Sequence, residues 1–254
     1  MNASFAPDLL GWKASKKGLV PNTADTDNSA SIEIAGAILD ILQVPRGVAT
    51  GIADPKSGRP LERAVAKSLM NDLPLYDSER KWQVYDTPVP INNFVQYSHL
   101  KKVDSLVEQN LELRITLGRD YLIKPDVAVA LPGRNPEDLP FLHASVSCKW
   151  TIRSDRVQNI RHENNQLIRH RRERLPHLVT VTAEPLPSRL ISIARGTGEV
   201  DAVYHIAYGA LDTALRNLVA QQMIQTAQLD AWEECIGLGR VRPYSDLAPT
   251  LARW

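Results

Sequence analysis

The strongest constraint on the fold is a pair of apolar segments separated by a short, turn-rich stretch. The segments YLIKPDVAVAL, residues 121–131, and LHASVSCK, residues 142–149, have the composition and length of strands. The intervening PGRNPEDLP is rich in the residues that form turns. If the two strands pair antiparallel, the start of the first lies beside the end of the second. The sequence therefore predicts that Asp126 lies near Lys149.

The rest of the chain alternates between helical and strand-like patterns. This alternation predicts an α/β fold with a central mixed sheet flanked by helices on both faces. The sequence contains no clear linker, so we expect one domain over residues 1–254, with residues 1–28, broken by Pro and Gly, as a loosely packed arm. Helices are expected over residues 29–44, 60–73, 94–116, 155–172, 187–198 and 210–237, and further strands over residues 82–89, 178–185 and 200–208.

Composition excludes several classes of protein. The formal net charge is +1, so a site for a polyanion has to be local. Cys148 and Cys235 are the only cysteines, which does not suggest a disulfide framework and fits a reducing cytoplasm. The first residues lack the pattern of a signal peptide, and no apolar run is long enough to span a membrane. A cytoplasmic protein without a membrane partner is expected.

The predicted strand that ends at Lys149 carries the residues best suited to chemistry. Ser147 and Lys149 project from one face, whereas Cys148 points the other way. Glu163 lies on the following helix and borders its buried stripe. Carboxylates beside a lysine suit phosphodiester hydrolysis, in which they hold a divalent metal while the lysine offsets charge that develops on the phosphate.

A family resemblance sharpens this hypothesis. Pro-Asp at 125–126, SVSCK at 145–149 and the glutamate at 163 resemble the PD-(D/E)XK nucleases. With CKWTIRSDR at 148–156, the chain looks more narrowly like the NgoMIV-like members of the CCGG group of type II restriction endonucleases. The likeness is densest from residue 142 to about 206 and weak in the C-terminal 45 residues. It implies the restriction-endonuclease-like core.

The resemblance also implies roles for the site residues. Asp126 would be the main ligand of Mg²⁺, together with the backbone carbonyl of Cys148, and Lys149 would contact the phosphate and the nucleophile. Ser147 stands where most of the superfamily has an acidic residue, and it would support Lys149. Glu163 would act on the metal through water, and Glu62 matches an additional upstream glutamate.

The cluster RSDR that follows Lys149 suits base recognition. Arg153 and Arg156 can each donate two hydrogen bonds to guanine, and Asp155 can accept one from cytosine. A two-fold dimer reads a palindrome. The resemblance implies a CCGG core, cleavage before the first C to leave four-base 5′ ends, a homodimer or homotetramer, and a cognate DNA methyltransferase. Phosphate contacts are expected from the basic run on the next helix, at Arg169, Arg171 and Arg172.

Several alternatives stay open at the level of sequence. RSDR could simply begin a helix, with Ser154 or Asp155 as the capping side chain. The chain could instead be a junction- or repair-type nuclease, or a DNA-binding protein that does not cleave. The bases that flank the core are not predicted, and the candidate residues to contact them are Asp27, Asn28 and Lys56.

Overall fold

The central feature of the computed structural model is a six-stranded mixed sheet, within a description that covers residues 1–16, 18–47, 57–196 and 198–253. The strands lie in chain order, with β3, β4 and β5 antiparallel and β5 to β8 parallel. The sheet therefore confirms the mixed α/β architecture. Its strands are β3 (Gln83–Tyr85), β4 (Val127–Leu131), β5 (Phe141–Lys149), β6 (His177–Thr182), β7 (Ala202–His205) and β8 (Val241–Pro243).

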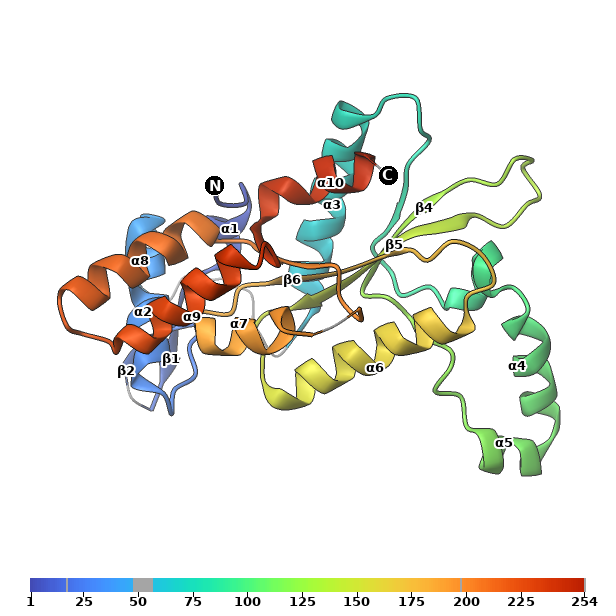
Figure 1. The fold of residues 1–254 in the computed structure, drawn as a ribbon, viewed down its shortest axis with the longest axis horizontal. Helices are drawn as coiled ribbons and strands as arrows, with labels where there is room; N and C mark the ends of the chain where they lie inside the picture. The colour runs from blue at the N-terminus through green and yellow to red at the C-terminus, as the bar shows by residue number, and fades with distance from the viewer. Residues whose placement is uncertain (17, 48–56, 197, 254) are drawn as a thin grey trace.

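Helices cover both faces of this sheet. Figure 1 shows α6 and α7 on one side, and α3 and α10 on the other. The helices α6 and α7 are the connections between the parallel strands β5, β6 and β7, and such crossovers place both helices on one face. These four helices are α3 (Arg59–Tyr76), α6 (Ser154–His170), α7 (Pro187–Ala194) and α10 (Leu247–Arg253).

The N-terminal residues are packed, which corrects the expectation of a loose arm over residues 1–28. They form α1 (Ala6–Leu9) and a hairpin of β1 (Trp12–Ser15) and β2 (Gly18–Pro21). Ala6 and Trp12 are buried in the main core, and the backbone N–H of Ala3 donates to Ile206. Pro and Gly here shape turns between short elements that bury apolar side chains, rather than a solvated lead-in.

The remaining helices differ from the predicted spans where a local residue ends them. The single helix expected over residues 94–116 is instead a short 3₁₀ turn (Val95–Tyr97), then α4 (Leu100–Gln109) and α5 (Leu111–Leu117). Asn110 separates the two helices because it leaves the helical conformation and caps α5. The long helix expected to residue 237 is interrupted over residues 221–225, where Gln222 has a φ of +57°. The elements there are α8 (Tyr208–Ala220) and α9 (Thr226–Gly237), and α2 (Ser29–Ile41) packs against α8. None of the described helices is long and apolar enough to cross a membrane.

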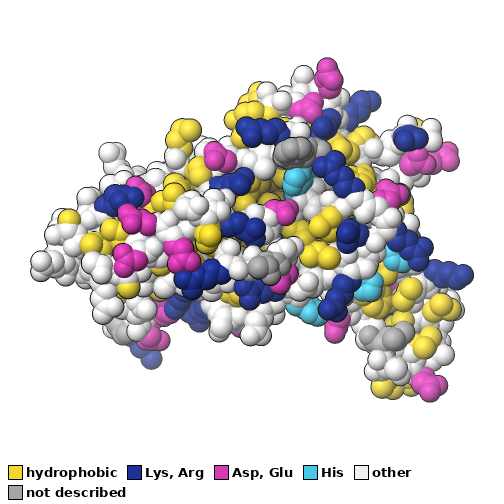
Figure 2. All heavy atoms as spheres, viewed as in Figure 1, with side chains coloured by type: hydrophobic (Ala, Val, Ile, Leu, Met, Phe, Trp, Pro, Cys, Tyr) yellow, Lys and Arg dark blue, Asp and Glu magenta, His cyan; other side chains and the backbone are white. Residues whose placement is uncertain are grey.

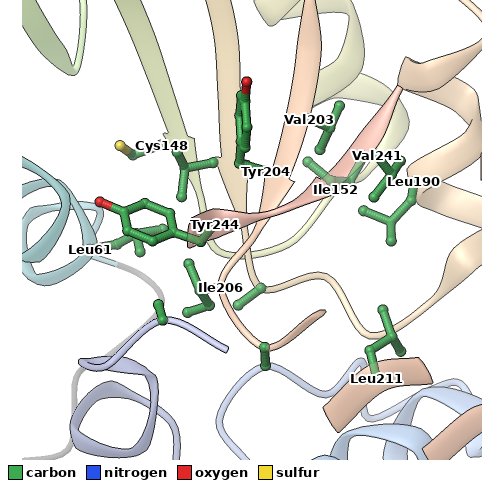
Figure 3. Close-up of a cluster of buried hydrophobic side chains, with 14 of the residues drawn as sticks. Leu61, Cys148, Ile152, Leu190, Val203, Tyr204, Ile206, Leu211, Val241 and Tyr244 are labelled. Carbon is green, nitrogen blue, oxygen red and sulfur yellow. The ribbon is translucent and has the colours of Figure 1, made fainter. Parts of the chain in front are cut away.

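The main core lies between the sheet and its helices, and it fixes the strand that carries the site. The side chain of Cys148 points into this core beside Leu61 and Tyr244, as Figure 3 shows. Ile152 is fully buried in the same core just after β5 ends. Apolar residues on both sides of Lys149 thus hold its backbone in place while its side chain faces the other way.

Candidate active site

The side chains of Asp126 and Lys149 meet at the junction of β4 and β5. The two strands pair antiparallel, with Val127 opposite Val146, so Asp126 precedes β4 where β5 ends. The Nζ atom of Lys149 donates to Oδ2 of Asp126 at 2.7 Å, and the backbone N–H of Cys148 donates to the same oxygen at 2.8 Å. Both side chains are about one-quarter exposed, so the pair is open to a ligand on one side. The geometry is the one that the strand pairing predicts.

Lys149 is held in its charged form. Burial lowers the pKa of this ammonium, but the neighbouring carboxylate of Asp126 outweighs burial, and the net pKa is above the ordinary value. A protonated lysine carries a positive charge and donates hydrogen bonds, and it is a poor proton acceptor at neutral pH. Ser147, two residues earlier on the same face of β5, is buried beside it.

Glu62 and Glu163 bring two more carboxylates to the same place. Burial raises the pKa of Glu163, the charge of Lys149 lowers it, and the charge of Asp126 raises it further. Burial also raises the pKa of Glu62, followed by the charge of Asp126, while Arg59 lies 3.4 Å from its carboxylate. The sequence placed all of these residues in one site, and the structure brings them within electrostatic reach of one another.

The base-recognition candidates follow directly at the start of α6. Arg153 is the residue before the helix, and its side chain and that of Asp155 are exposed. In the part of the chain that the structure describes, no side chain caps this helix, so the alternative in which Ser154 or Asp155 serves as the cap is wrong. Their exposure leaves Arg153 and Asp155 available for contact with another molecule.

Arg156 is oriented by its own segment. Its Nη1 atom donates to the carbonyl oxygen of Thr151 at 2.8 Å and to the hydroxyl of Thr151 at 2.7 Å. A guanidinium has five N–H donors in a fixed plane, so these two bonds set its direction and leave the other nitrogens for a ligand. The sequence pattern did not reveal this role of Thr151.

A cleft of about 690 Å³ lies beside the start of α6. Arg153 and Asp27 line it, together with Arg189 of α7. Asn28 and Lys56 are the other candidates for contact with the flanking bases. The side chain of Asn28 caps α2, because it accepts a hydrogen bond from the backbone N–H of Ser31. Lys56 lies outside the described residues.

The predicted phosphate contacts lie at the other end of α6. Arg169, Arg171 and Arg172 are exposed, and α6 ends at His170, two residues earlier than predicted. Arg169 follows Asp155 by fourteen positions along the helix, a rise of about 21 Å. Figure 2 shows Lys and Arg side chains spread among acidic ones over this view rather than gathered in one basic patch. A ligand that met both ends of α6 would have to be long.

Glu184 is a carboxylate that the sequence analysis missed. It follows β6, is fully buried, and its Oε2 accepts from the backbone N–H of Ile152 at 2.6 Å. The strand pattern over 178–185 hid it among apolar neighbours. Its position in the sequence could have indicated it. Glu184 lies just past the end of β6, the next strand after the one that ends at Lys149, and neighbouring parallel strands bring their carboxyl ends together.

Comparison with known proteins gives the family. The model of the NgoMIV restriction enzyme family matches residues 12–136 and 132–252. The type II restriction enzyme NgoMIV of Neisseria gonorrhoeae is 36% identical over 266 residues, which cover 93% of this chain and 91% of that protein. The chain belongs to the NgoMIV restriction enzyme family. It is therefore a type II restriction endonuclease, a site-specific deoxyribonuclease.

The residues present fit the divalent metal that type II restriction endonucleases generally use. Within the described residues, no group of three or more His, Cys, Asp or Glu side chains forms a closed metal cluster. The site instead combines three carboxylates with one lysine, a local excess of negative charge and of the oxygen ligands that Mg²⁺ prefers. Both hydrogen bonds of Asp126 end on Oδ2, which leaves Oδ1 for a cation.

Proposed function

We propose that this restriction endonuclease hydrolyses both strands of double-stranded DNA at a palindrome with a CCGG core, with Mg²⁺ as cofactor. Cleavage is before the first C and leaves four-base 5′ ends. The observation that carries the catalytic part is the contact of Lys149 with Asp126 at 2.7 Å in a partly exposed site with two further carboxylates nearby.

Few residues form the proposed metal site. Asp126 and the backbone carbonyl of Cys148 would hold Mg²⁺, and Glu163 would act on it through water. Bound Mg²⁺ supplies a Lewis acid at the scissile phosphate and lowers the pKa of an attacking water. Glu62 adds negative charge from the start of α3, where Arg59 orients it.

The protein's own groups then perform the remaining work. Lys149, held positive by Asp126, donates to a phosphate oxygen and offsets the charge that grows in the transition state. Ser147 supports the lysine from the same face of β5. Glu163 is half-buried with a raised pKa, so it accepts a proton from water more readily than an exposed glutamate.

Recognition is proposed for the segment after Lys149. Arg153 and Arg156 donate to guanine O6 and N7, and Asp155 accepts from cytosine N4. Thr151 orients the guanidinium of Arg156, which supports a base contact that depends on the orientation of this side chain and not on its charge alone. Two such sets in a two-fold dimer match the four base pairs of CCGG.

Contacts to the DNA backbone are proposed for Arg169, Arg171 and Arg172. Their separation of about 21 Å from the recognition segment corresponds to roughly six base pairs of duplex. These residues would therefore contact phosphates beyond the central tetranucleotide. The assembly would be a homodimer or homotetramer of one nuclease domain per chain, and a cognate methyltransferase would protect the host DNA.

Digestion of one long, sequenced DNA with Mg²⁺ tests this proposal. Discrete fragments whose number matches that of a CCGG-centred palindrome are expected. Cuts confined to junctions or damaged sites would favour a junction- or repair-type nuclease on the same fold. Retention of specific binding without any cuts would favour a DNA-binding protein that does not cleave.

A further inference from the structure

The buried carboxylate of Glu184 joins two segments that are distant in sequence. Its Oε2 accepts from the backbone N–H of Ile152 at 2.6 Å, and its Oε1 accepts from the backbone N–H of Leu186 at 2.9 Å. Ile152 immediately precedes Arg153, and Leu186 is the residue just before α7. One side chain therefore fixes the base-recognition segment relative to the start of α7.

These two segments form walls of the same cleft. Ile152, Arg153 and Ser154 line it from one side, and Ser188 and Arg189 line it from α7. Arg189 lies close to Glu184 as well, with its Nη1 3.9 Å from Oε2, while its Nη2 donates to Asp25 at 2.5 Å. A shift of Glu184 would change the spacing between Arg153 and Arg189.

A neutral side chain could not make the same pair of contacts. Burying a carboxylate is strongly unfavourable unless hydrogen bonds compensate. Glutamine has the same shape but only one accepting oxygen, so its amide N–H₂ would face one of the two backbone N–H donors. The fully buried charge of Glu184 is thus explained by the two donors that it holds together.

We propose that Glu184 is a positioning residue for sequence recognition, which holds the segment 152–156 against α7 so that Arg153 and Arg156 meet their bases in register. The proposal rests on the function proposed above. Its role is geometric: it touches neither DNA nor the reacting atoms, and it acts through the backbone of Ile152.

The proposed role of Glu184 should depend on pH, because it requires the charged carboxylate. Burial raises its pKa to about 7, against the effect of its two backbone hydrogen bonds. The charged groups that face it are Arg189 of α7 and Asp25 before α2, and His205 of β7 approaches its backbone carbonyl at 3.0 Å. Protonation would place an O–H opposite one backbone N–H and remove that bond. Discrimination between DNA sequences should therefore weaken as the pH falls through about 7.

The test compares binding to two duplexes in Ca²⁺, one with a CCGG core and one with that core scrambled. For Glu184→Gln we expect the ratio of the two affinities to fall about tenfold, the worth of one hydrogen bond to a charged group. Affinity for the scrambled duplex should change less than about twofold, because phosphate contacts remain. The matched control is Glu234→Gln. Glu234 is an exposed residue of α9 that pairs with Arg195, so this variant removes a carboxylate without affecting the cleft.

A folded Glu184→Gln protein with an unchanged ratio, or with both affinities lowered equally, would overturn the proposal. If that variant does not fold, the wild-type ratio is measured from pH 6 to pH 8.5. A ratio that rises with pH supports the proposal, and a flat ratio contradicts it. Histidine titration would not change this ratio, because it alters phosphate contacts on both duplexes alike. Failure of the wild-type protein to prefer CCGG at any pH would instead overturn the proposed function, and this inference with it.

Discussion

The ammonium nitrogen of Lys149 lies 2.7 Å from Oδ2 of Asp126 and joins the end of β5 to the start of β4. The backbone N–H of Cys148 donates to the same oxygen, so one carboxylate atom orients both the lysine and the end of its strand. The residues proposed for catalysis and for recognition are adjacent in sequence, since Arg153 follows Lys149 by four residues.

Lys149→Met should lower the rate of DNA cleavage by at least about 10²- to 10³-fold, the usual effect of losing one charge-stabilising donor. Specific binding in Ca²⁺ should survive, because the side chains proposed for recognition lie on the next segment. Single-turnover cleavage and binding titrations check both expectations. Cleavage at the wild-type rate would remove Lys149 from the chemistry.

Glu163→Gln should raise the Mg²⁺ concentration needed for half-maximal cleavage by about tenfold or more. The variant removes one of the carboxylates whose charge favours a cation, while it keeps the volume of the side chain. The measurement is the single-turnover rate over a series of Mg²⁺ concentrations. An unchanged Mg²⁺ dependence would place Glu163 outside the metal site.

Arg156→Ala should reduce discrimination between a CCGG duplex and a scrambled one by about 1–3 kcal/mol, the usual worth of a bidentate guanine contact. Arg171→Ala is the matched control, because this exposed arginine lies at the other end of α6. It should weaken binding to both duplexes and reduce the salt dependence by about one unit. Equal loss of both affinities in Arg156→Ala would indicate a phosphate contact instead.

The buried His205 should make folding sensitive to acid. Burial lowers its pKa to about 4, below the unfolded value of 6.5. The unfolded chain therefore binds the extra proton first, so stability is fully present above about pH 6.5 and is lost as the pH falls toward 4. This one group contributes about 3 kcal/mol of that loss. Nδ1 accepts from the backbone of Ala207, and a protonated ring could not make that bond.

Urea unfolding of the wild-type protein and of His205→Gln at pH 4.5 and pH 7 measures this effect. The variant should have a smaller difference in the free energy of unfolding between the two pH values. An identical difference in both proteins would show that His205 does not govern the acid sensitivity.

The sequence predicts the parts of the site that depend on local pairing. A short turn between two strands sets an antiparallel register, so the contact of Asp126 with Lys149 follows from alternation and turn residues. The position of Glu163 near the buried face likewise follows from helical periodicity. Their roles as catalytic groups stay proposals.

Other features depend on contacts between distant segments. The bond from Ile152 to Glu184 requires the parallel register of β5 and β6, which no local pattern sets. The packing of Trp12 and its neighbours depends on a core formed by the whole chain. The apolar pattern continues across Asn110 and hides the break there, although Asn is a good capping residue.

Sequencing the ends of the DNA products formed with Mg²⁺ tests the central claim most directly, with Lys149→Met as the matched control. The account predicts that wild-type products end in 5′ overhangs of four bases, CCGG, at every cut. The control should yield no such ends under the same conditions. Products with other or random termini, or identical ends from the Lys149→Met protein, would contradict it.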